Sequence, residues 1–107
     1  MAEKKQTKIS PKGMVFITST FNNTLVAVTT DKGNVVSWSS SGAAGFKGTR
    51  KSTPYAASSA VDAAVKKAFE KGLRTVDVYV KGPGAGRDSA LRAIKNGGLS
   101  ILSIADI

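Results

Sequence analysis

The 107-residue sequence contains no cysteine and no histidine. These two absences exclude disulfides, zinc sites built from Cys and His, cysteine nucleophiles and every catalytic triad that needs an imidazole. Acidic residues are also scarce, with seven Asp and Glu against sixteen Lys and Arg. The few carboxylates show no spacing typical of a catalytic pair. We therefore assign no catalytic residue and no metal ligand, and we predict a protein that is not an enzyme and carries no cofactor.

Long apolar runs are missing as well, since no segment approaches the ~20 apolar residues of a membrane span. Aromatic residues make up only 7% of the chain, so the core is expected to consist of Val, Ile, Leu and Ala. The polar stretch MAEKKQTKISPKG predicts a flexible basic arm over residues 1–13. Residues 14–107 then form one domain, and no membrane association is expected.

Positive charge is what the chain has in excess. The formal net charge is +9 and the sequence pI is about 10.1. Such a balance on a small chain indicates a polyanionic partner, in the first place nucleic acid. The alternative is a soluble protein that happens to be basic.

The apolar pattern predicts an α/β fold. Segments with the alternating or β-branched composition of strands are residues 14–21, 24–30, 35–42, 75–81 and 99–107. Turns are expected at Asn22-Asn23, where the Asn pair suits positive φ, and at Lys32-Gly33.

Two helices complete the predicted order βββαβαβ. Apolar residues at three- and four-residue spacing indicate a helix that begins at Pro54 and stops at Gly72. A shorter helix runs through Ala90 and Ile94 and is closed by glycines. Right-handed crossovers make the last two strands parallel to a neighbour. The expected product is a mixed five-stranded sheet with two packed helices.

The stretch KGPGAGR (81–87) combines glycines with two cations between a strand and a helix. Glycine allows close backbone approach, and a helix N-terminus favours an anion, so the loop suits a phosphate. It matches neither a Walker A loop nor a dinucleotide fingerprint, because Arg87 stands where the latter needs glycine. A plain strand–helix connection is one alternative, and a nucleotide-dependent enzyme or switch is another.

Two further segments have the composition of RNA-contacting loops. GFKGTRKST (45–53) mixes cations, hydroxyls and glycine, and no acidic residue occurs between Asp31 and Asp62. Paired Asn side chains at FNNT (21–24) can make polar contacts to RNA. A solvated charged loop and an ordinary hairpin turn are the respective alternatives. Both glycine-rich loops precede a helix, so we expect them at the carboxyl edge of the sheet.

The stretches TFNNTLVAVTTDKGNVVSWSSSGAAGFKGTRKSTPYAA (20–57) and VYVKGPGAGRDSALRAI (78–94) closely resemble the bacterial-type small-subunit ribosomal protein S11 family. The resemblance extends from about Met14 to Ile107. It implies a ribonuclease-H-like fold without catalytic activity. It also implies a place on the platform of the small subunit, bound to 16S rRNA near the messenger exit and the rRNA 3′ end. The expected location is the cytoplasmic ribosome, with an organellar ribosome as the alternative.

The resemblance also implies which residues and proteins make contact. The residues in the matching motifs are Asn22, Asn23, Thr24, Lys47, Gly48, Arg50, Lys51, Ser52, Lys81, Gly82, Pro83, Gly84, Gly86 and Arg87. Expected neighbours are the seventh, eighteenth and twenty-first small-subunit proteins, and no homo-oligomer is expected. Family members usually continue with a Lys/Arg-rich tail, whereas this sequence stops at Ile107. Either the sequence is truncated or its lineage lacks the tail. Lysines of the arm would then supply part of that charge.

Overall fold

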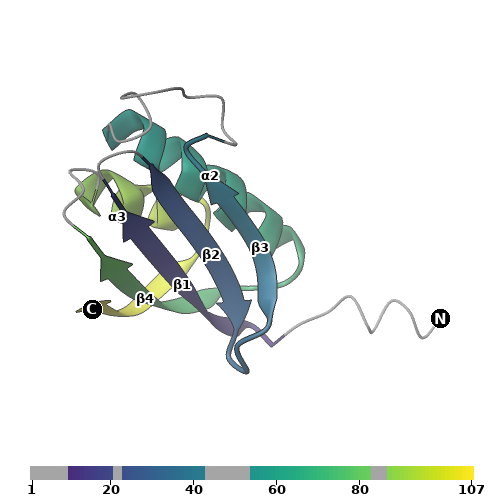
Figure 1. Ribbon diagram of the computed structural model, residues 1–107. Helices are drawn as coiled ribbons and strands as arrows, with labels where there is room; N and C mark the ends of the chain where they lie inside the picture. Colours follow the sequence, from purple (N-terminus) through teal and green to yellow (C-terminus); the bar gives the residue numbers. More distant parts are fainter. Residues whose placement is uncertain (1–9, 21–22, 43–53, 83–86) are drawn as a thin grey trace.

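The structure, a computed structural model, describes residues 10–20, 23–42, 54–82 and 87–107. Five strands and two helices follow one another in the predicted order βββαβαβ (Figure 1). The strands are β1 (Lys12–Ser19), β2 (Thr24–Thr30), β3 (Val35–Ser40), β4 (Thr75–Lys81) and β5 (Ser100–Asp106). The helices are α2 (Pro54–Glu70) and α3 (Arg87–Asn96).

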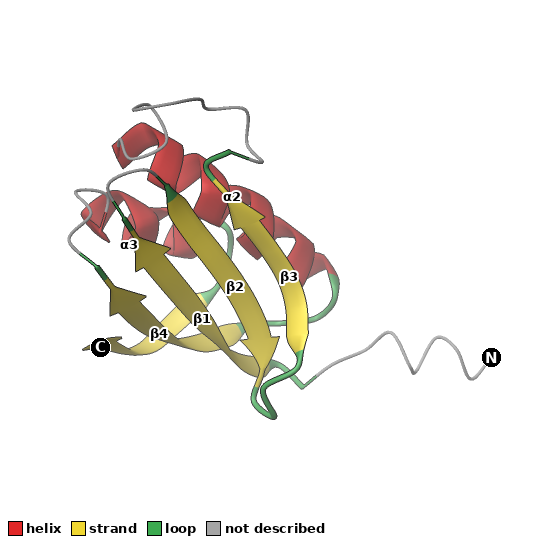
Figure 2. Cartoon of the chain, in the orientation of Figure 1, coloured by secondary structure: helices red, strands yellow, loops and turns green. Residues whose placement is uncertain are grey.

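The five strands form one mixed sheet in the order β3-β2-β1-β4-β5. β2 is antiparallel to both of its neighbours, whereas β1, β4 and β5 run parallel to one another. This arrangement confirms the mixed α/β fold and is consistent with the expected ribonuclease-H-like class. Both helices cover the same face of the sheet, and the opposite face carries no helix of the described residues (Figure 2).

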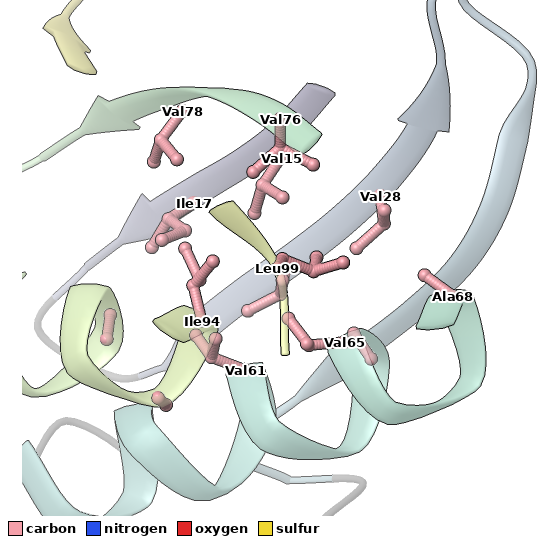
Figure 3. Close-up of a cluster of buried hydrophobic side chains, with 14 of the residues drawn as sticks. Val15, Ile17, Val28, Val61, Val65, Ala68, Val76, Val78, Ile94 and Leu99 are labelled. Carbon is pink, nitrogen blue, oxygen red and sulfur yellow. The ribbon is translucent and has the colours of Figure 1, made fainter. Parts of the chain in front are cut away.

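The core lies between the sheet and the two helices (Figure 3). Val76, Val78 and Val80 of β4 point inward, as their alternation with polar residues predicts. Each fully buried valine contributes about 1.5–3 kcal/mol through removal of apolar surface from water. Other fully enclosed side chains come from β1, β2, both helices and the turns that follow them: Val15, Val28, Val61, Val65, Leu73 and Ile94.

Small residues let α2 lie close to the sheet. Its buried stripe consists of valines and of Ala60, Ala64 and Ala68, which carry no bulk beyond a methyl group. At this short separation the buried hydroxyl of Ser37 in β3 donates a hydrogen bond of 2.7 Å to the carbonyl oxygen of Ala64. The alanine stripe predicted from the sequence therefore permits a polar contact between sheet and helix.

The ends of α2 follow the predicted signals. The helix begins at Pro54, whose fixed φ suits the first helical position. It stops before Gly72, which has a φ of 113°. The amide of Leu73 donates to the carbonyl of Ala68 at 3.1 Å, and that of Gly72 donates to Phe69 at 3.0 Å. These two bonds form the Schellman pattern that satisfies the last carbonyls of a helix.

Strand bounds differ from the sequence-based expectation at β1 and β3, and by one residue at each end of β5, which covers 100–106 rather than 99–107. β1 covers 12–19 rather than 14–21, because Lys12 and Gly13 pair with β4 and the carbonyl of Pro11 accepts bonds from Arg74 and Thr75. β3 ends at Ser40 rather than at residue 42. The sequence predicts that Lys12 and Gly13 belong to the basic arm, whereas the structure places them in β1. Residues 1–9 lie outside the described residues, so the arm stays a prediction there.

Candidate nucleic-acid interface

The described residues that flank the three basic or polar segments lie at one edge of the sheet. β1, β3, β4 and β5 end at this edge, β2 begins there, and both helices begin there (Figure 1). The segments FNNT, GFKGTRKST and KGPGAGR connect these ends. The described ends of these connections therefore lie at the expected carboxyl edge, which we call the loop edge, whereas residues 43–53 and 83–86 lie outside the described residues.

Backbone contacts join the strand ends from which these connections start. Gly82 has a φ of 104°, and a Cβ on it would collide with the carbonyl oxygen of Ser19 at the end of β1. The amide of Ser41 donates to the carbonyl of Thr24 at 3.0 Å, which ties the end of β3 to the start of β2. Gly82 therefore has a packing reason to be glycine in addition to any approach to phosphate.

The hairpin between β1 and β2 holds itself together through Thr20 and Asn23. Their main chains bond at 2.8 Å, and the Thr20 hydroxyl accepts from the Asn23 amide at 3.0 Å. The side-chain oxygen of Asn23 accepts from the amide of Thr24 at 2.9 Å, so an RNA contact by Asn23 would use its NH2 group. Positive φ occurs only at glycines among the described residues, so the expectation of positive φ is wrong for Asn23.

The remaining predicted contact residues are placed unequally. Lys81 is exposed at the end of β4, and Arg87 is the first residue of α3. Thr24 is only 1% exposed, which favours a packing role over contact with RNA through its side chain. Outside the described residues lie Asn22, Lys47, Gly48, Arg50, Lys51, Ser52, Pro83, Gly84 and Gly86.

The two helix N-termini at the loop edge differ electrostatically. The first turn of α3 contains Asp88, whose carboxylate already complements the partial positive charge of that helix end. The first turn of α2 contains no acidic residue. Asp106 also ends β5 at this edge. The positive potential is therefore least opposed at the start of α2, which follows the basic segment 45–53.

Ser41 was not singled out from the sequence. It is fully buried directly after β3, and its hydroxyl oxygen has no hydrogen-bond partner within the described ranges 10–20, 23–42, 54–82 and 87–107. Ser41 is the last of three consecutive serines, and this local pattern does not predict that its side chain is buried. A buried hydroxyl without a partner costs about 1–3 kcal/mol.

Sequence reasoning also missed a groove of about 410 Å³ between α2 and α3. α2 contributes three hydroxyl side chains to this groove, and α3 contributes one hydroxyl, a guanidinium and an amide. Such groups are the usual donors to sugar and phosphate. No local sequence pattern reveals the groove, because it depends on how the two helices pack. The lining residues are Tyr55, Ser58, Ser59, Asp62, Ser89, Arg92, Ala93 and Asn96.

The same described ranges hold no cluster of three acidic side chains that could bind a metal ion. Within them, neither helix has the length and apolar character required to cross a bilayer.

A family model for ribosomal protein S11 matches residues 13–107. The chain belongs to the ribosomal protein S11 family. S11 proteins are structural constituents of the small ribosomal subunit that bind rRNA, and they are not enzymes. Membership confirms the resemblance seen in the sequence and excludes the rival interpretation of the KGPGAGR loop as part of a nucleotide-dependent enzyme.

Proposed function

We propose that this S11 protein uses its loop edge to hold rRNA on the platform of the small subunit, near the messenger exit and the rRNA 3′ end. The observation that carries the proposal is that the strand and helix ends flanking three basic or polar connections lie at one edge of the sheet. Scattered cations would support only loose attraction, whereas converging loops can contact neighbouring stretches of one folded RNA.

The mechanism combines phosphate neutralisation with close backbone approach. Lys81 ends β4 and Arg87 begins α3 at this edge, and the sequence of segment 45–53 adds Lys47, Arg50 and Lys51. The N-terminus of α2 adds the partial positive charge of the helix dipole, and its first turn contains no acidic residue. The expected RNA-contacting residues are those in the three motifs, with Thr24 as a supporting residue.

The same proposal includes the setting of the protein. One copy sits in each small subunit, on the cytoplasmic ribosome, with an organellar ribosome as the alternative. The seventh, eighteenth and twenty-first small-subunit proteins are its proposed neighbours.

Salt dependence tests the mechanism. Neutralisation of ~3–6 phosphates predicts that affinity for small-subunit rRNA falls about ten- to thousandfold over a fourfold rise in salt. Filter binding measures this directly. An affinity independent of salt would contradict phosphate neutralisation.

Placement on the platform has its own test, which exploits the absence of cysteine. A Lys81→Cys variant provides one attachment point for an iron chelate that cleaves nearby RNA with hydroxyl radicals. Lys95→Cys is the matched control, because Lys95 lies in the last turn of α3, at the end away from the loop edge. In assembled subunits we expect strong cleavage of platform and 3′-end rRNA from position 81 and weak cleavage from position 95. Equal cleavage from both positions would refute the assignment of the loop edge.

A further inference from the structure

A second groove, of about 410 Å³, runs along the outer edge of β3 where that strand borders the second half of α2. Among the described residues, no acidic side chain lines this groove. Its lining contains two lysines and the only tryptophan of the chain. The lining residues are Val36, Ser37, Trp38, Ser39, Ala63, Lys67 and Lys71. We call it the β3 groove.

Trp38 stands at the edge of the sheet. Ser37 and Ser39 are buried, so strand alternation directs Trp38 away from the core, and its 63% exposed side chain lines the groove beside the lysines. Its cross-strand partner on β2 is Ala27, whose methyl group covers little of an indole. β3 is also the edge strand of the sheet. Much of the ring is therefore left accessible to a flat partner.

Lys71 is held at this groove by a hydrogen bond of 2.9 Å from its ammonium group to the carbonyl of Val36. An ammonium has three donors, so the group keeps capacity for an anion. The bond also occupies an edge carbonyl of β3. A further strand could not pair at this carbonyl without displacing the Lys71 ammonium, so added β-structure is a poor occupant for this groove.

An exposed aromatic ring beside lysines is the combination that binds unpaired RNA, since the base stacks on the ring and the cations meet phosphates. We propose that the β3 groove binds a single-stranded segment of RNA, with one base on Trp38 and the backbone phosphates on Lys67 and Lys71. The inference rests on the proposed function in that the partner is RNA. It adds a second surface, because Lys67 and Lys71 lie at the end of α2 away from the loop edge.

Intrinsic fluorescence tests the stacking directly, because Trp38 is the only tryptophan. The full chain is titrated with oligoadenylate of about ten nucleotides, a length within known single-strand site sizes. We expect saturable quenching of the tryptophan emission, with a midpoint that matches the binding curve from filter binding. Binding without a change in emission would overturn the proposal.

Substitutions separate the ring from the charge. Trp38→Ala should weaken oligoadenylate binding about 5- to 100-fold, and Trp38→Phe should restore most of the loss. Lys67→Ala should lower the slope of log affinity against log salt by about 0.7, the value for one phosphate of a single strand. Lys66→Ala is the matched control, since Lys66 neighbours Lys67 on the exposed side of α2 without lining the groove.

The outcomes distinguish the two proposals. Strong rRNA binding with unaltered tryptophan emission refutes the β3 groove and leaves the loop edge intact. Failure to bind rRNA in any assay refutes both. Equal effects of Lys66→Ala and Lys67→Ala contradict the groove. Polyglutamate that quenches Trp38 as strongly as oligoadenylate would show an acidic protein segment as the occupant, which also overturns the assignment to RNA.

Discussion

Gly82 at the end of β4 lies so close to Ser19 at the end of β1 that no side chain fits between them. Gly82 belongs to the predicted RNA-contacting segment KGPGAGR, and Ser19 directly precedes the hairpin that contains FNNT. Their contact means that the hairpin after β1 and the glycine loop after β4 start from one rigid point. The spacing between these two connections is therefore fixed before any RNA binds.

Substitution of Gly82 tests this contact. Gly82→Ala combines a φ of 104° with a collision against backbone, so we expect a loss of more than about 2 kcal/mol in the free energy of unfolding. Gly33→Ala is the control, because its φ is 91° but a Cβ there meets nothing within 4 Å. It should cost only about 1 kcal/mol. Urea denaturation measures both, and equal losses would show that the contact with Ser19 is unimportant.

Two buried serines of the β3 region should respond oppositely to loss of their hydroxyls. Ser37→Ala removes the bond to Ala64, and we expect a loss of about 1 kcal/mol in stability. Ser41→Ala removes a buried oxygen without a partner in the described residues, and we expect no loss or a gain of up to about 1 kcal/mol. Thermal and urea unfolding of the free protein give the comparison. A destabilised Ser41→Ala protein would mean that this hydroxyl is bonded in solution.

Lys81 at the end of β4 and Lys95 in the last turn of α3 should contribute unequally to rRNA binding. Lys81→Ala, at the loop edge, should reduce the slope of log affinity against log salt by about 0.7–0.9. Lys95→Ala, in the last turn of α3, removes the same charge and should leave the slope within error. Both residues are exposed, so neither change should alter the unfolding midpoint. A similar decrease for both variants would indicate diffuse attraction in place of a defined edge.

Arg74 should matter for stability and little for RNA. Its guanidinium lies 3.8 Å from the centre of the Phe69 ring and donates to the carbonyls of Phe69 at 2.8 Å and Leu73 at 2.7 Å. Arg74→Ala should cost about 1 kcal/mol, and Arg74→Lys should recover only part because an ammonium lacks the planar fork. The salt slope of rRNA binding should stay constant. A reduced slope with unchanged stability would assign Arg74 to the interface instead.

The sequence predicted those parts of the fold that depend on local patterns. The alternation in 75–81 defined β4 to the residue, and Pro54 with Gly72 bounded α2. Pairing of Lys12 and Gly13 was missed, because it depends on β4, more than sixty residues away, and no local signal records it.

The candidate site was predictable in composition and place, and less so in the role of single residues. A glycine at position 82 is compatible with close approach of either a phosphate or the carbonyl of Ser19. Only the structure shows the contact with Ser19. Trp38 lies in the stretch 20–57 that resembles the family, yet the α2 residues that line the groove with it come from beyond a long connection. Contacts between distant segments therefore decide what local patterns leave open.

The parallel pairing of β1 with β4 also bears on how the chain is made. Synthesis delivers β1, β2 and β3 first, and these can form their meander at once. β1, the central strand, cannot pair on its other side until residues 75–81 have been synthesised, because a parallel neighbour requires a long crossover connection. A nascent chain that ends before β4 has the hairpin but neither Gly82 nor its loop. The proposed RNA-binding edge thus arises late in translation, and we expect tight engagement of rRNA only after β4 and the start of α3 have been produced.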